Sequence, residues 1–222
     1  MGAKVSNSDS FIEEVTEEVR REKLFGYLRR YGWIGVVCVL LLVGSAAWIE
    51  YRNAQTRAAA EATGDALVAA LTNEDIDARA QAIAAIETQG ATTAVTTLLT
   101  AAVRQEAGDA DAAAATLATL AANQDIPALY RDLAAFKAAM LPSEDSAARM
   151  TTLQQLGQPG QPFRLLALEQ IAYLQLDAGD TAAAIATLRQ VEEDAAVPQG
   201  LRERVQTLMV ALGEPLPASV TE

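Results

Sequence analysis

The sequence predicts an all-α protein, with a single N-terminal transmembrane helix followed by an α-solenoid of about four helix pairs. Three observations predict it. The stretch from Gly32 to Ile49 contains no charged residue. Ala, Leu, Gln, Arg and Glu, which are good helix formers, dominate the chain that follows. Pro127, Pro162 and Pro198 recur at spacings of 35 and 36 residues, and proline is tolerated best where a helix begins.

The transmembrane helix is predicted over residues 32–51. Its uncharged stretch would span about 27 Å as a helix, close to the hydrocarbon thickness of a bilayer. Aromatic residues lie at both ends, where the headgroups would be: Tyr31, Trp33, Trp48 and Tyr51. A buried core helix and a cleavable signal peptide are the alternatives, the latter because Ser45 and Ala47 are small residues in a cleavage-like spacing. The long leader with six acidic residues favours an uncleaved anchor.

Residues 1–31 are predicted to form a cytoplasmic amphipathic leader, with a helix beginning near Phe11 and an apolar stripe of Phe11, Val15 and Val19. Five basic residues lie between positions 20 and 30, and only Arg52 and Arg57 lie close on the other side of the span. Basic flanks remain in the cytoplasm. We therefore expect a single-pass protein with its N-terminus inside and residues 52–213 outside.

Composition limits the chemistry that this chain can perform. It contains no histidine, and its one cysteine, Cys38, lies in the predicted span. A Ser-His-Asp triad, a Cys-His pair and a His or Cys metal cluster therefore cannot be built. Residues 51–222 hold 22 acidic and 11 basic residues, which disfavours nucleic acid as a partner. We expect a non-enzymatic protein without cofactor or metal.

Internal repetition organises the outer domain. An offset of 71 residues aligns Ala107-Gly108-Asp109 with Ala178-Gly179-Asp180, Leu117 with Leu188, Leu120 with Val191 and Arg131 with Arg202. Two units of about 35 residues give this offset. The predicted helix pairs are 54–90, 91–126, 127–161 and 162–197, followed by a capping helix over 199–212, which Gly213 ends, and a flexible tail over 214–222. A plain helical bundle with accidental spacing is the alternative.

Helix pairs with a period near 34 resemble the tetratricopeptide repeat, in a degenerate form. The last pair carries the closest match, with Gly179-Asp180 at the turn and Ala184, Ile185 and Leu188 on the second helix. This resemblance implies that Ile185 is buried between helices, so that Ile185→Asp would cost several kcal/mol.

The order of a charged leader, one anchor and an outer repeat domain resembles the YfgM-like family, ancillary subunits of the bacterial Sec translocon. Residue-level similarity lies in 11–51, mainly in the stretch from Phe11 to Leu24 and in Tyr31-Gly32. The resemblance implies a periplasmic domain in the bacterial inner membrane, which works with periplasmic chaperones on exported polypeptides. The alternative function is a structural subunit of another inner-membrane complex, respiratory or photosynthetic.

Two sets of candidate contact residues follow. A concave surface of stacked helix pairs can hold a polypeptide segment, and its candidate groove residues are Tyr130, Arg131, Arg164 and Tyr173. Packing between repeats is the alternative for the tyrosines, and solvation is the alternative for the arginines. Within the span, Gly35, Gly44 and Ala47 are candidates for close contact with another membrane helix.

Overall fold

A computed structural model describes the backbone of residues 6–143 and 145–215, and the side chains of 29–30, 33–143 and 145–215. Within these ranges nine segments are α-helices and no segment is a strand, so the predicted all-α class is confirmed there. The chain divides into two compact units, Met1–Ala62 and Thr63–Glu222, and each is described by itself.

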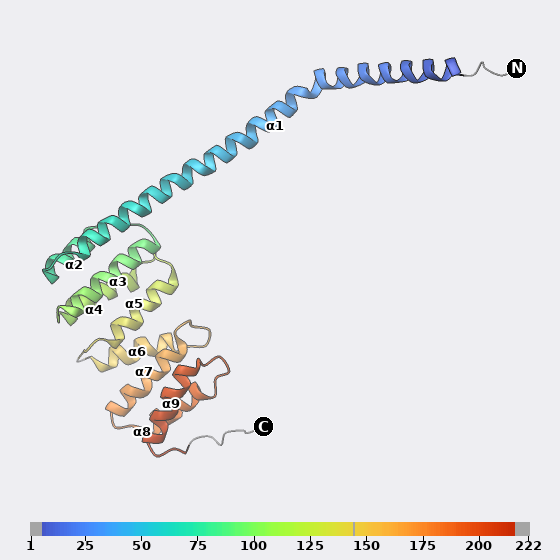
Figure 1. Ribbon diagram of the computed structural model, residues 1–222. Coiled ribbons are helices and arrows are strands. Elements are labelled where there is room, and N and C mark those ends of the chain that lie inside the picture. The colour runs from blue at the N-terminus through green and yellow to red at the C-terminus, as the bar shows by residue number, and fades with distance from the viewer. Residues whose placement is uncertain (1–5, 144, 216–222) are drawn as a thin grey trace. The chain divides into compact units, whose positions relative to one another are not determined.

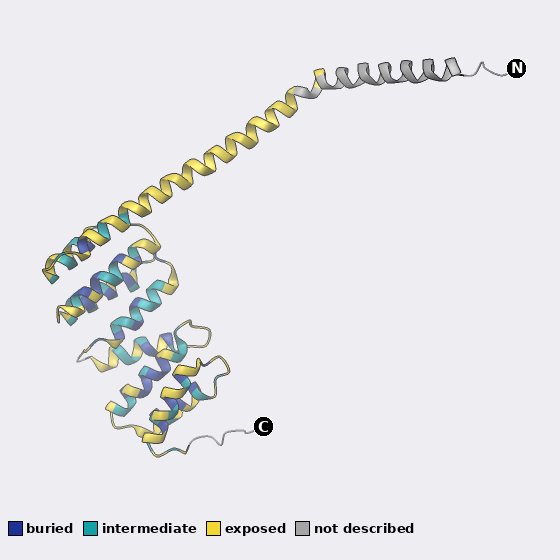
Figure 2. Ribbon diagram, in the orientation of Figure 1, coloured by how far each residue is buried: buried dark blue, intermediate teal, exposed yellow. Residues whose placement is uncertain are grey.

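The first unit contains most of the helix α1, which runs Ser6–Leu71. The last residues of α1, after Ala62, belong to the second unit. The described part of the helix already includes Ser6, so the predicted start near Phe11 was wrong. The stripe of Phe11, Val15 and Val19 lies outside the residues whose side chains are described. From Trp33 onward α1 contains a segment long and apolar enough to cross a membrane. Its large apolar side chains are exposed (Figure 2).

The second unit is a succession of short helices in which neighbours along the chain pack on one another from α2 to α9 (Figure 1). The boundaries between the predicted helix pairs, at 90/91, 126/127 and 161/162, fall between helices. The helices are α2 Ile76–Ala84, α3 Ala91–Glu106, α4 Ala110–Ala122, α5 Ala128–Met140, α6 Ser146–Leu156, α7 Arg164–Asp177, α8 Thr181–Glu192 and α9 Gln199–Ala211.

The helix caps repeat along this unit. Every even-numbered helix, from α2 to α8, has an aspartate N-cap whose side chain accepts the backbone N–H of the residue three positions later. Such a cap satisfies one of the free N–H groups at the start of a helix. The four caps, at spacings of 34, 36 and 35 residues, are Asp75, Asp109, Asp145 and Asp180. The helix starts therefore repeat with the period that the prolines indicated.

Equivalent positions of the two halves also share burial. Leu117 and Leu188, which the offset of 71 residues aligns, are 2% and 0% exposed. Gly108 and Gly179, in the turns before them, both have φ of 81°, a left-handed conformation that glycine adopts without strain. These aligned positions therefore have the same burial and the same backbone conformation.

Ile185 is only partly buried, so its predicted place between the helices was wrong. Ala184 and Leu188 are both 0% exposed and lie one helical turn apart on the packed face of α8. Ile185 is rotated by about 100° from Ala184 around the helix axis, which places it at the edge of that face.

The buried residues that the structure describes form three core clusters. The first lies among the end of α1, α2 and α3, the second among α3, α4 and α5, and the third and largest among α5 to α9. As expected, α9 is followed by Gly213, which has φ of 91°. Glu214, in the expected tail, pairs with Arg189 of α8, and residues 216–222 lie outside the described residues.

Candidate functional site

Two neighbouring hollows at the surface between α7 and α9 share Gly200 and Arg204 in their linings, and together they form the candidate site, which we call the α7–α9 groove. Both helices bury one face in the largest core cluster, α7 through Leu168 and Ile171 and α9 through Leu201 and Val205. The side chains on another face of each helix remain at the surface. Leu166 and Tyr173 of α7 are 36% and 38% exposed there.

The first hollow, with a volume of about 580 Å³, lies where α7 and α9 begin. Its apolar lining comes from both helix starts and from the loop between α8 and α9: Pro162, Leu165, Leu166, Ala196, Pro198 and Leu201. Its charged lining consists of Arg164, Asp194 and Arg204. The combination of apolar walls and a few fixed polar groups is typical of a binding site.

The second hollow, of about 440 Å³, continues along α9. It shares Gly200 and Arg204 with the first hollow and adds Tyr173 of α7 together with Thr207 and Ala211 of α9. Because Arg204 lines both hollows, its side chain lies at the middle of the groove.

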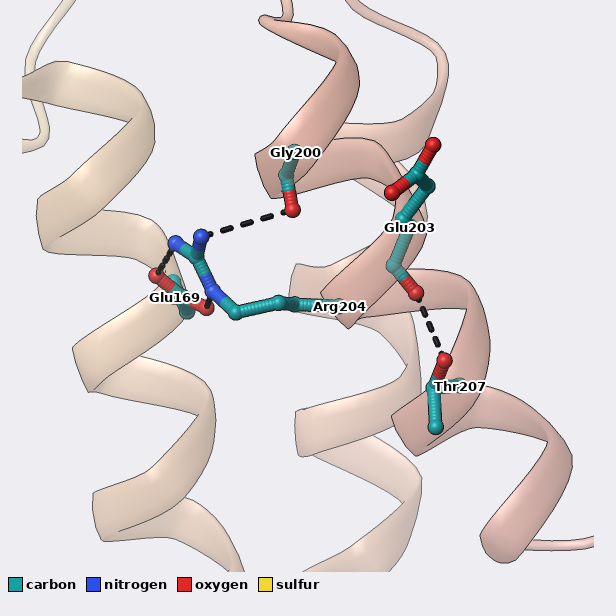
Figure 3. Close-up of polar contacts among 5 residues, drawn as sticks. All are labelled: Glu169, Gly200, Glu203, Arg204 and Thr207. Atoms are coloured by element: carbon teal, nitrogen blue, oxygen red, sulfur yellow. Dashed lines mark hydrogen bonds and ion pairs between the residues drawn. The ribbon is translucent and has the colours of Figure 1, made fainter.

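An ion pair fixes Arg204 in that position (Figure 3). Its Nε and Nη2 donate to the two carboxylate oxygens of Glu169, each at 2.9 Å, and its Nη1 donates to the carbonyl oxygen of Gly200 at 3.3 Å. The Glu169 side chain is 6% exposed and that of Arg204 is 54% exposed. The hydrogen bonds from Arg204 to Glu169, and the charge of that carboxylate, raise the pKa of Arg204. The guanidinium is therefore permanently charged and held by two parallel bonds.

A second ion pair forms the wall near the start of α7. Arg164 donates through Nη1 to Oδ2 of Asp194, in the loop between α8 and α9. The backbone N–H of Ala196 donates to the other carboxylate oxygen at 2.8 Å. The hydrogen bond from Ala196 and the neighbouring Arg164 lower the pKa of Asp194. The contact with Arg164 holds the loop beside α7, and the contact with Ala196 fixes the conformation of the loop itself.

The structure brings together two of the four residues predicted to line a groove. Arg164 and Tyr173 lie on α7 and line the α7–α9 groove. Tyr130 and Arg131 lie on α5 and do not line it. Tyr130 packs against the second core cluster, and Arg131 donates through Nη1 to the side chain of Gln124.

The three predicted membrane contact residues lie on α1. Gly35, Gly44 and Ala47 are exposed. A side chain added at Gly35 or Gly44 would meet no atom within 4 Å. Their surfaces are thus accessible in the first unit, which is what a contact with another helix requires.

Sequence reasoning missed Glu169 and Arg204. A signal for the pair was present, because the two residues are 35 positions apart. One repeat length places them at similar positions on successive odd-numbered helices, and their opposite charges suit an ion pair.

Another hollow, of about 350 Å³, is lined by threonines of α3 and its preceding loop, with Arg104 and Thr116. These polar groups bond to one another or to the backbone. Thr100 donates to the carbonyl oxygen of Thr96 at 2.9 Å, and Arg104 donates to Thr116. The hollow has less apolar lining than the α7–α9 groove, and most of its threonine hydroxyls already have partners.

Among the described residues, no group of three or more His, Cys, Asp or Glu side chains could hold a metal ion. The arrangement between α7 and α9 presents apolar surface and two arginines, Arg164 and Arg204, each held by an acidic partner, which suits binding. Comparison of the chain with protein-family models, with curated proteins and with solved structures found no match.

Proposed function

We propose that this protein is a non-enzymatic accessory of protein export, anchored in the bacterial inner membrane, whose outer helical domain binds polypeptide segments beside the Sec translocon. The observation that carries the binding role is the α7–α9 groove, where Leu166 and Tyr173 stay exposed beside Arg204. A surface of this kind can hold a segment of chain without any chemical step.

The outer domain in this proposal is a degenerate tetratricopeptide-like solenoid. The recurrence of aspartate caps at every second helix supports it, as do the equal φ angles of Gly108 and Gly179. Solenoids of helix pairs expose long surfaces along one set of helices. In this chain α7 and α9 would belong to that set.

The proposed topology places the N-terminus in the cytoplasm and residues 52–213 in the periplasm. The apolar, exposed segment of α1 supports the membrane span. The basic residues before Gly32 support the orientation. Reporter domains that are active only outside the cytoplasm should be active when fused after residue 60. A mature protein lacking its first 47 residues would instead establish signal cleavage.

The assignment to the translocon rests on the resemblance of residues 11–51 to the YfgM-like family. The anchor would hold a weakly binding groove beside its membrane partner, and short tethers give effective concentrations of about a millimolar. Deleting residues 1–51 should therefore abolish co-purification of the partner and leave the helical domain folded.

Photo-crosslinking in cells tests this function. A photoreactive residue at position 166, in the α7–α9 groove, should capture exported polypeptides or a periplasmic chaperone, and mild-detergent purification should recover translocon subunits. The same residue at Gln190, which is exposed on α8, is the matched control and should capture much less. Capture of respiratory or photosynthetic subunits alone would establish the structural-subunit function and remove the translocon assignment.

A further inference from the structure

We propose that the α7–α9 groove recognises a neutral or basic polypeptide segment through an aromatic side chain, whose ring lies on the face of Arg204 between Leu166 and Tyr173. This inference rests on the proposed function and specifies which segments the groove selects.

The hydrogen bonds of Arg204 leave its flat face as the contact surface for a ligand. Nε and Nη2 are bonded to Glu169, and Nη1 is bonded to Gly200. These bonds use three of its five N–H groups, and a ligand carboxylate at the other two would face the negative charge of Glu169. The guanidinium plane is delocalised and weakly hydrated, so it stacks well on an aromatic ring. More than half of the side chain is exposed for such a contact.

The residues on either side of Arg204 complete the contact surface. On α7, Leu166 precedes Glu169 by three positions and Tyr173 follows it by four, so all three lie on one face of the helix. Arg204 bonds to Glu169 from α9 and lines a hollow with Leu166 and another with Tyr173. An aromatic ring on Arg204 would bury apolar surface against both neighbours.

The charges around the groove determine which flanking residues a ligand can carry. Arg164 and Arg204 are each neutralised by an acidic partner, Asp194 and Glu169. Glu203 also lines the groove, and residues 51–222 as a whole carry twice as many acidic as basic residues. The negative electrostatic potential of this domain repels acidic segments and attracts basic ones. We therefore assign Phe, Tyr or Trp beside neutral or basic residues as the recognised pattern.

Peptide binding to the full-length protein in detergent micelles tests this assignment. The probe is a fluorescein-labelled Gly-Ser-Lys peptide with one central Phe, measured by fluorescence anisotropy. Matched peptides carry Leu in place of Phe, or Glu in place of Lys. The Phe-Lys peptide should bind more tightly than either, by about two- to five-fold over the Leu peptide, as expected for a cation–π contact at an exposed site.

Three variants locate the contact. Arg204→Lys keeps the charge that pairs with Glu169 and loses the planar face, so it should weaken binding of the Phe peptide by about two- to five-fold and leave the Leu peptide unchanged. Tyr173→Ala should weaken the Phe peptide similarly. Because Tyr173 is exposed, this variant decides the question if Arg204→Lys fails to fold. Arg202→Lys, two positions away and lining a different hollow, should have no effect.

The possible failures are distinguishable. Equal binding of the Phe and Leu peptides, equal binding of the Glu and Lys peptides, or binding that ignores both Arg204 and Tyr173 would overturn this inference and leave polypeptide binding intact. If no peptide binds, the inference and the polypeptide-binding role of the groove both fall. Co-purification then still tests whether the protein associates with the translocon.

Discussion

Glu169 of α7 and Arg204 of α9 are joined by two hydrogen bonds of 2.9 Å, and the carboxylate is almost fully buried while the guanidinium is half exposed. A buried carboxylate without its partner keeps the cost of its lost hydration. Removing Arg204 and removing Glu169 therefore have different costs. Removal of Arg204 is the more informative change, because it leaves the carboxylate buried without a partner.

We expect Arg204→Ala to lower the free energy of unfolding by about 1–3 kcal/mol, because it leaves Glu169 buried without a cation. The double variant Arg204→Ala with Glu169→Leu should be more stable than the single variant, since the uncompensated charge is gone. Chemical denaturation followed by circular dichroism measures both. A double variant that is less stable than Arg204→Ala would show that the carboxylate has another stabilising role.

The second prediction concerns the packing of α8. Leu188 is fully buried, and Leu188→Ala should cost about 2–5 kcal/mol, since it leaves a cavity in the largest core cluster. Ile185→Ala should cost clearly less, because Ile185 is only partly buried. Thermal melting monitored by circular dichroism compares the two variants. Equal costs would contradict the burial difference between these neighbouring turns.

The third prediction concerns the repeating caps. Asp180 accepts the N–H of Ala183 at 3.0 Å, and Asp180→Ala should destabilise the domain by about 0.5–2 kcal/mol. Asp109→Ala should have a similar effect, because Asp109 accepts from Ala112 in the equivalent geometry. Asp177→Ala, at the end of α7 and without a capping role, is the control for the loss of one negative charge. Urea denaturation of the three variants measures the difference.

The fourth prediction is a pH dependence at Asp194. Its pKa is lowered in the folded protein below the ordinary value of 3.8. The carboxylate therefore contributes stability that is fully present above the unfolded pKa and is lost as the pH falls through the folded pKa. Asp194→Asn lacks this contribution at every pH. The difference in melting temperature between wild type and Asp194→Asn should be constant above about pH 5 and should shrink below 3.8.

If the melting-temperature difference between wild type and Asp194→Asn instead grows as the pH falls, protonated Asp194 stabilises the loop. Asp125→Asn is a suitable control for this series. Asp125 is exposed and lies in the equivalent loop between α4 and α5.

Much of the helical layout could be predicted from the sequence because breaks and helix starts are local signals. Gly108, Gly179 and the three spaced prolines indicated where helices begin and end, and the structure agrees. The four aspartate caps carry the same signal as the prolines, because they recur at the same spacing.

The candidate site was only partly predictable, since a groove depends on which helix faces meet. Arg164 and Tyr173 were found because they are large residues on a first helix of a predicted pair. Tyr130 met the same description, but it packs against the second core cluster. Its partners come from other helices, and the residue type alone does not identify them. Ile185 was misplaced because consecutive residues of a helix differ in direction by about 100°, so an error of one position moves a side chain off the packed face.

Each helix of the second unit packs on its neighbours along the chain, and this arrangement affects how the domain opens. Contacts between residues close in sequence allow fast folding, and we expect such a stack of helices to open locally at one end before it unfolds as a whole. The cluster at α2 consists of few buried side chains, among them Ala70, Ala80 and Ile83, whereas the cluster around α7 and α8 is much larger. Amide hydrogens of α2 should therefore exchange with solvent long before those of α7, so that the groove-bearing helices remain ordered while the opposite end of the stack unravels.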